Sequence, residues 1–185
     1  MTRCDRCFLQ TRVCMCDEIP RIDTRTRVLV IRHASEISKP SNSGRLVAAA
    51  LSNCALLEYG ARNQLLDQAP LREPGTWVLF PGGTPVDAPP EPPPRQLVVL
   101  DATWTQARRM YQRIGALRGI PVFALPAPAT PSKQLRTPPR AETVSTVQAV
   151  ARALELLEGP EVVAPLDAAY AVMVERSRAT SRNPG

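Results

Sequence analysis

The sequence predicts an α/β fold in which a mostly parallel sheet carries helices on both faces, preceded by a small cysteine-rich segment. Three observations lead to this prediction. Apolar runs of strand length alternate along the 185 residues with longer segments of helical periodicity. The strand-length runs are apolar throughout, which is typical of parallel strands covered on both faces. Four of the five cysteines come before the first of these runs.

The first strand is expected at residues 26–33, a short run rich in β-branched side chains. A turn-rich loop follows, in which Asn42 or Ser43 can cap the next helix. That helix is expected to run through residues 45–60 and to stop at a glycine. Cys54 would then lie in this helix as a small buried apolar residue.

The rest of the chain continues the alternation. Further strands are expected at residues 76–83, 96–100 and 120–125, and further helices near 105–114, 145–159 and 166–178. Ligands of open parallel sheets bind at the carboxyl ends of the strands. The residues that directly follow the strands are therefore the first candidates for a functional site.

Charge and hydropathy restrict the class of protein. The net charge is +6 and the isoelectric point is about 9.5. Such an excess of cations serves solubility or binds a polyanion such as RNA or DNA, and charge alone does not choose between them. No apolar run approaches the ~18 residues that span a bilayer, and no secretory signal opens the chain. We therefore expect a cytoplasmic protein without a membrane partner, whose thiols are reduced.

The cysteine-rich segment has the spacing of a metal site. Its cysteines follow the pattern C-x2-C, a six-residue gap and C-x-C, so that four thiolates on two short turns can close a tetrahedral site around zinc. The predicted ligands are Cys4, Cys7, Cys14 and Cys16. Four protein ligands leave no open position, so the zinc would be structural and would supply the folding energy of a segment without its own core. We expect residues 1–22 to form this segment and residues 23–185 the main domain. Its arginines would contact phosphate or only solubilise it.

Polar and aromatic residues gather after three of the strands. Asp101 can accept a proton, pair with Arg108 or cap the following helix. Trp104 can belong to the core or form a flat wall for a base. His33, the only histidine, is more simply a packed side chain. The sequence has no P-loop, G-x-G-x-x-G, G-x-S-x-G or H-E-x-x-H motif, which excludes the usual nucleotide hydrolases, simple dinucleotide dehydrogenases and triad hydrolases.

Four motifs, in their order along the chain, resemble those of the DTW-domain family of tRNA-uridine aminocarboxypropyltransferases. They are CDRCFLQTRVCMC, RHASEISKPSNSGRL, LDATWTQARRM and STVQAVARAL. The family takes its name from the Asp-x-Thr-Trp stretch, which is Asp101, Thr103 and Trp104 here. The resemblance spans most of the chain, from Cys4 to about Leu157.

The resemblance implies a reaction and a fold. Such enzymes transfer the 3-amino-3-carboxypropyl group of S-adenosylmethionine to N3 of a uridine in tRNA, in the variable loop or the D-loop, and release methylthioadenosine. The fold is similar to that of the SPOUT methyltransferases, an α/β domain with a C-terminal trefoil knot. The segment 136–145 and the start of its helix would close the knot over the cofactor. The oligomeric state, monomer or homodimer, stays open.

The resemblance also assigns residues to roles. Asp101 would be the general base that accepts the N3 proton. The cofactor pocket would include Leu79, Phe80, Pro81, Gly82, Thr103, Trp104, Ser145 and Thr146. The residues facing tRNA phosphates or the target base would be Arg32, His33, Lys39, Asn42, Arg45, Arg108 and Arg109.

The sequence departs from the family at one position that matters. The last motif commonly contains an acid where this chain has Gln148, so binding of the cofactor's amino group could differ. Two alternatives use the same residues. One is a zinc-dependent RNA-binding module without catalysis, and the other is the same transfer to ribosomal RNA.

Overall fold

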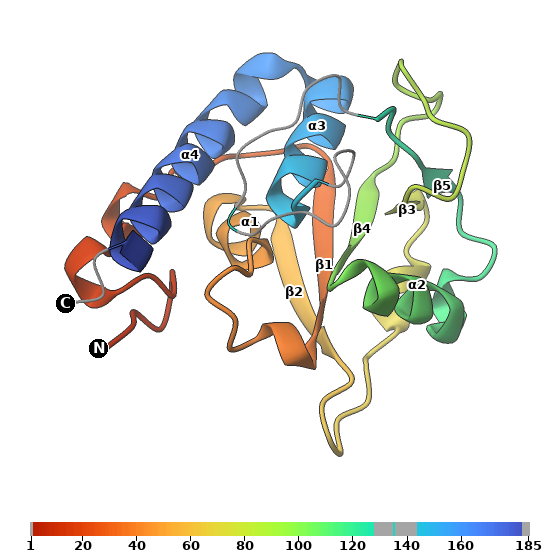
Figure 1. The fold of residues 1–185 in the computed structure, drawn as a ribbon. Coiled ribbons are helices and arrows are strands. Elements are labelled where there is room, and N and C mark those ends of the chain that lie inside the picture. The colour runs from red at the N-terminus through yellow and green to blue at the C-terminus, as the bar shows by residue number, and fades with distance from the viewer. Residues whose placement is uncertain (1, 128–134, 136–143, 183–185) are drawn as a thin grey trace.

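A computed structural model describes residues 2–127, 135 and 144–182, and its ribbon is drawn in Figure 1. Five strands form one sheet in the order β2-β1-β4-β3-β5, and every neighbouring pair is parallel. The strands are β1 (Arg27–His33), β2 (Cys54–Tyr59), β3 (Thr76–Leu79), β4 (Gln96–Asp101) and β5 (Val122–Phe123). The helices are α1 (Gly44–Ala50), α2 (Trp104–Arg113), α3 (Thr146–Glu158) and α4 (Pro160–Arg182).

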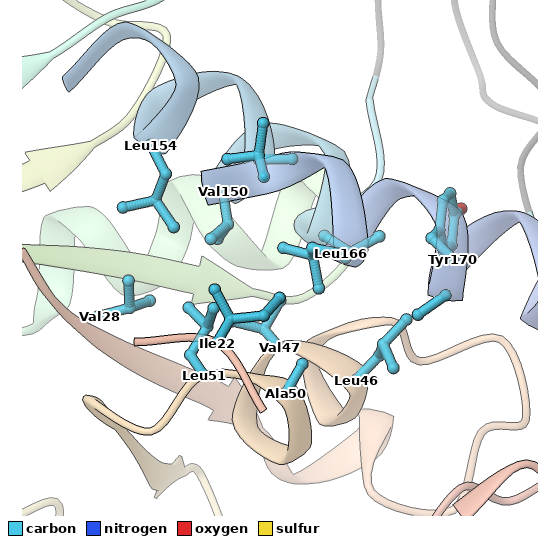
Figure 2. Close-up of a cluster of buried hydrophobic side chains, with 14 of the residues drawn as sticks. Ile22, Val28, Leu46, Val47, Ala50, Leu51, Val150, Leu154, Leu166 and Tyr170 are labelled. Atoms are coloured by element: carbon cyan, nitrogen blue, oxygen red, sulfur yellow. The ribbon is translucent and has the colours of Figure 1, made fainter. Parts of the chain in front are cut away.

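The central strands β1 and β4 bury both of their faces, as their unbroken apolar sequences predict. Val28 and Val30 contribute to a core beneath α1, α3 and α4, whereas Leu29 and Ile31 contribute to a second core beneath α2. Figure 2 shows the first core, in which side chains of α1, α3 and α4 meet those of β1. The prediction of a parallel sheet with helices on both faces is thus confirmed.

The expected helix at residues 45–60 is wrong in its second half. Helix α1 ends at Ala50, and residues 54–59 form the edge strand β2, which pairs with β1. Asn53 marks the change, because its side-chain amide donates to the carbonyl oxygens of Thr24 and Arg25 just before β1. Cys54 therefore lies on a strand, half-buried, and burial raises the pKa of its thiol to about 12.

Three other elements differ from the predicted length by four residues or more. The strand expected at residues 76–83 ends at Leu79, before the turn at Pro81, Gly82 and Gly83. Strand β5 has only two residues; Pro121, which cannot donate to a ladder, precedes it, and beyond Phe123 the pairing continues as an isolated bridge between Pro85 and Ala124. Helix α4 begins at Pro160, six residues earlier than expected, and continues through Pro165. An interior proline costs about 3 kcal/mol in a helix. Here Val163 and Leu166, on either side of Pro165, are buried in the core, which offsets this cost.

The cysteine-rich segment packs against the main body of the chain. Cys7, Leu9 and Met15 are buried in the same core as α1, α3 and α4. Figure 1 shows this segment beside the C-terminal half of α4. The residues expected to close a knot, 136–143, lie outside the described part of the chain. Within the described part, none of the helices is both long and apolar enough to cross a membrane.

Candidate active site at the carboxyl ends of the strands

Asp101, the last residue of β4, is the centre of the candidate site. Its side chain is 1% exposed, and both of its oxygens accept hydrogen bonds from other elements. Asn42 Nδ2 donates to Oδ2 at 2.5 Å, and Thr146 Oγ1 donates to Oδ1 at 2.7 Å. Asn42 lies just before α1 and Thr146 is the first residue of α3. One carboxylate therefore joins the beginnings of two helices to the end of a central strand.

Gly44 lets α1 approach this carboxylate. A Cβ atom at Gly44 would contact Asp101 Oδ2 and would lie 2.6 Å from its Cγ. No real side chain tolerates such a contact, so the loop and the helix can sit this close to Asp101 only with glycine at this position. Asn42 links the first turn of α1 to Asp101, because its Oδ1 also accepts a hydrogen bond from the backbone N–H of Arg45 at 3.2 Å.

Burial raises the pKa of Asp101 above its ordinary value, while the hydrogen bonds from Thr146 and Asn42 act in the opposite direction. Two charged residues are near. Glu36 is fully buried and pairs with Lys39, with Oε1 and Nζ 2.6 Å apart. Arg32 lies beside Asp101 in strand register and donates to Glu58 Oε1 at 2.8 Å. The site is a buried, charged network rather than an apolar pocket.

The helices on either side of the site begin in the same way. Thr103 is the N-cap of α2, where Gln106 Oε1 accepts from its backbone N–H at 3.1 Å and from its hydroxyl at 2.7 Å. Ser145 is the N-cap of α3, where Gln148 Oε1 accepts from the same two groups at 3.1 and 2.9 Å. Both are capping boxes, in which glutamine performs the same task as glutamate. Thr103, and not Asp101, caps α2.

The only histidine is held in place beside α2. Its Nδ1 accepts from the backbone N–H of Ser35 at 3.2 Å and lies 2.8 Å from the hydroxyl of that residue. Gln106 Nε2 donates to the Ser35 hydroxyl at 2.9 Å. The loop after β1 is thereby linked to the first turn of α2, which agrees with the interpretation of His33 as a packed, hydrogen-bonded side chain.

An aromatic stack borders the site. Phe80 follows β3 and lies between the rings of Trp104 and Tyr111, with centroids 5.7 Å and 4.6 Å away and planes nearly parallel to both. Trp104 remains 45% exposed. Offset stacking of this kind fixes ring orientation. The stack therefore supports Trp104 from behind and leaves part of its surface to solvent.

The structure brings many of the predicted cofactor residues to one edge of the sheet. Leu79 ends β3, Phe80 carries the stack, and Pro81 and Gly82 form the exposed turn that follows. Thr103 and Trp104 begin α2, and Ser145 and Thr146 begin α3. These elements all meet at the carboxyl ends of β3 and β4, as expected for parallel sheets.

The predicted RNA-contact residues divide into two groups. Arg108 and Arg109 are exposed on α2, and His33 and Lys39 are partly exposed after β1. Arg32, Asn42 and Arg45 are instead buried, with exposed fractions of 9%, 0% and 8%. The structure therefore places these three inside the network around Asp101 and not on the surface.

The sequence assigned no role to two members of the network, Tyr111 and Glu58, and gave Ser43 only the role of a possible helix cap. Ser43 accepts a hydrogen bond from the backbone N–H of Val147 at 3.3 Å, which adds a second link between α1 and α3. Tyr111 supports Phe80, and Glu58 neutralises Arg32. A signal existed for Tyr111, which lies seven residues after Trp104 and so shares its side of the helix. The spacing of residues gave no signal for the contact of Ser43 with Val147 or for that of Glu58 with Arg32, because these partners are distant in sequence.

The four cysteines of the first segment form a compact cluster. All four sulfur atoms lie within 4.8 Å of one another, with Cys4 and Cys16 3.5 Å apart and Cys7 and Cys14 3.8 Å apart. A tetrahedral zinc with bonds of ~2.3 Å sets sulfur separations of about 3.8 Å, so the cluster fits such an ion. Backbone hydrogen bonds from Cys7 and Arg6 lower the pKa of Cys4 to about 6, whereas burial and the neighbouring thiols raise the pKa of Cys16, so the fit to a metal rests on the positions of the four sulfur atoms.

Comparison with known proteins agrees with this geometry. The chain is 25% identical over 169 residues to tRNA-uridine aminocarboxypropyltransferase 2 of Macaca fascicularis, with 84% of this chain and 56% of the relative covered. It is 27% identical over 192 residues to tRNA-uridine aminocarboxypropyltransferase A of Arabidopsis thaliana, with 84% and 72% covered. The chain thus spans about half the length of the macaque relative.

One solved structure shares the fold. It is the SAM-dependent rRNA:acp-transferase Tsr3 from Vulcanisaeta distributa, with a TM-score of 0.56, 16% identity, and 86% of this chain and 80% of that chain covered. At this identity the likeness concerns the fold alone. A family model described as the DTW domain matches residues 1–178, which include the cysteine cluster, the Asp101 network and most of α4. The chain therefore belongs to the DTW domain family.

Proposed function

We propose that this protein transfers the 3-amino-3-carboxypropyl group of S-adenosylmethionine to N3 of a tRNA uridine and releases methylthioadenosine. The observation that carries the proposal is the meeting of the family's motifs at one buried carboxylate. Asn42 and Thr146 come from motifs 59 and 45 residues away from Asp101, and both donate to its side chain. The macaque and Arabidopsis relatives are named tRNA-uridine aminocarboxypropyltransferases, which supports this class of reaction.

The proposed cofactor site lies between the starts of α2 and α3. Backbone N–H groups at the beginning of a helix attract a carboxylate such as that of the methionyl group. Leu79, Phe80 and the Pro81-Gly82 turn supply the apolar side that an adenosine needs. Trp104 offers a partly exposed indole to the sulfonium, for which cation–π attraction is available. A trefoil knot closed by segment 136–145 remains part of this proposal.

We assign to Asp101 the removal of the uridine N3 proton. The N3 lone pair then attacks the γ-carbon of the methionyl chain, the carbon–sulfur bond breaks, and its electrons remain on sulfur as a neutral thioether leaves. A raised pKa makes the Asp101 carboxylate a stronger proton acceptor than a surface acid. Asn42 and Thr146 hold its oxygens, so that catalysis depends mainly on positioning.

The tRNA would approach over α2. Arg108 and Arg109 are exposed there, beside the exposed edge of Trp104. His33 and Lys39 flank the same strand ends. Arginine and lysine contacts to phosphate position a nucleic acid without reading its sequence, so the net charge of +6 serves affinity.

The test is a turnover assay with purified, zinc-loaded protein, S-adenosylmethionine and unmodified tRNA. We expect stoichiometric methylthioadenosine and a uridine whose mass increases by one aminocarboxypropyl group. Asp101→Asn should abolish both, and Leu65→Ala, at a side chain that is 97% exposed, should abolish neither. Release of S-adenosylhomocysteine would show that the methyl group is transferred and would refute the proposal.

The same assay separates the alternatives. An RNA-binding module without catalysis would bind tRNA with steep salt dependence and release no thioether. An enzyme acting on ribosomal RNA would release methylthioadenosine with a ribosomal RNA fragment and not with tRNA. Turnover with tRNA and not with the fragment is the result that the proposal expects.

A further inference from the structure

Two arginines attach the cysteine-rich segment to the rest of the molecule. Arg176 of α4 donates from Nη1 to the carbonyl oxygen of Cys14 at 2.9 Å and from Nη2 to both carboxylate oxygens of Glu18 at 2.8 and 2.7 Å. Arg45 of α1 lies with Cζ 4.1 Å from the centroid of the Phe8 ring. The segment is thus held by the first and the last helix of the chain.

The backbone at Phe8 is unusual. Its φ is +62°, a left-handed conformation that bulky side chains seldom adopt and that costs of the order of 1 kcal/mol. The turn places Phe8 directly after Cys7, and its N–H donates to the carbonyl oxygen of Cys4 at 2.9 Å. The ring therefore reaches Arg45 from a turn that the first two cysteines define.

Arg45 connects this turn to the active-site loop. It is 8% exposed, and its Nη2 donates to the carbonyl oxygen of Ile37 at 2.8 Å. Its backbone N–H donates to Asn42 Oδ1, and the other end of that amide donates to Asp101. The contacts form an unbroken series from the cysteine turn through Phe8, Arg45 and Asn42 to Asp101.

We propose that Arg45 is a positioning residue through which the folded cysteine segment fixes the loop 37–44 against Asp101. The planar guanidinium stacks on the Phe8 ring and is oriented by it, so its hydrogen bond to Ile37 depends on the cysteine turn being formed. Metal binding, which the four sulfurs fit, would then order the active-site loop as well as its own segment. The inference about the loop does not depend on which reaction the protein catalyses.

Amide hydrogen exchange of the full, zinc-loaded chain tests the proposal. The backbone amides that report on this loop are those of Ile37, Lys39, Asn42 and Leu46, which donate to the carbonyl oxygens of Ala34, Glu36, Lys39 and Ser43 in the loop and just before it. Phe8→Leu keeps an apolar side chain and all four cysteines but removes the ring. We expect exchange of these amides to rise about 2- to 30-fold, the factor that corresponds to a cation–π contact of ~0.5–2 kcal/mol. Phe8→Tyr should restore the wild-type rates.

Arg176→Met is the matched control, because it removes the other arginine that holds the segment. Exchange should rise around Cys14 to Glu18 and at the end of α4, and should stay unchanged in residues 37–46. Unchanged exchange in 37–46 for Phe8→Leu, with zinc retained, would overturn the proposal. The proposal would also be overturned if Phe8→Tyr accelerated the exchange of these amides as much as Phe8→Leu does. Tyrosine keeps the aromatic ring, so the contact between the ring and Arg45 would then not be what holds the loop.

If Phe8→Leu loses zinc, Arg45→Met gives the answer, since it leaves the cysteine segment unaltered. The same amides should then accelerate although one zinc per chain is retained, and unchanged rates would overturn the proposal. An activity measurement adds a separate result that rests on the proposed function. Phe8→Leu should lower kcat for methylthioadenosine release more than it changes KM for tRNA. Altered exchange in a protein that releases no thioether would refute the proposed function and leave this inference standing.

Discussion

Replacing Gly44 by alanine should destabilise the protein, although alanine is the better helix former. The new methyl group would overlap the Asp101 carboxylate, with its carbon 2.6 Å from Cγ. Overpacking of this kind costs about 1–3 kcal/mol. Displacing the carboxylate from Asn42 or Thr146 costs about 1.5–3 kcal/mol more. The higher helix propensity of alanine than of glycine would offset at most ~1 kcal/mol of this loss. The net loss should be roughly 1.5–5 kcal/mol.

Urea unfolding of the zinc-loaded protein measures this loss. Gly115→Ala is the control, because its added Cβ would meet only Gln68 Oε1 at 3.8 Å, an ordinary contact. In an Asp101→Ala background the overlap is gone, so Gly44→Ala should there be neutral or stabilising. A loss below about 0.5 kcal/mol, or a loss of equal size in both backgrounds, would refute the explanation given for Gly44.

Three further results are expected. Because the folded pKa of Asp101 is raised, the folded state binds more protons than the unfolded state above pH 3.8, and stability falls as pH rises from there through the folded pKa. Asp101→Asn should remove this fall, so the free energy of unfolding of the variant should improve relative to that of the wild type as the pH rises. A difference between the two proteins that stays constant from pH 4 to 8 would contradict the raised pKa of Asp101. Colorimetric assay should find one zinc per chain, lost in Cys7→Ser and kept in Cys54→Ala, which lies outside the cluster; zinc retained in Cys7→Ser would exclude the assigned site. Arg108→Gln with Arg109→Gln should lower the slope of log affinity for tRNA against log salt by about 0.7–0.9 per lost phosphate contact, and an unchanged slope would remove α2 from the interface.

The sequence predicted most of the sheet because its central strands are continuous apolar runs. It did not predict β2, since the residues from Ala48 to Leu57 are mostly small or aliphatic, with only Ser52 and Asn53 polar, and such a run suits either a helix or a strand. Only pairing with β1, a long-range contact, decides between them. Tertiary packing also extended α4 through Pro165, where local propensity alone predicts a break.

The candidate site was predictable in its central residues but not in their arrangement or in the residues that support them. Asp101, Thr103 and Trp104 stand together in the sequence, and the parallel topology places them at a strand end. The contacts of Asp101 to Asn42 and Thr146 join residues far apart in the chain, and spacing gives no information on them. For the same reason Arg45 was assigned to the RNA surface, whereas its position in the buried network depends on Phe8, thirty-seven residues earlier.

The two glutamines of the capping boxes have an electrostatic consequence for Asp101. Neither α2 nor α3 carries an acidic residue in its first turn. The partial positive charge at the start of each helix, about half an elementary charge, is therefore not neutralised locally. A glutamate in place of Gln148 would add a negative charge at the N-terminus of α3. It would compete there with Asp101, which accepts a hydrogen bond from Thr146, the first residue of this helix. With glutamine there, no acidic side chain in the first turn of α3 competes for the helix dipole, which favours the ionised form of Asp101 and opposes part of the effect of burial.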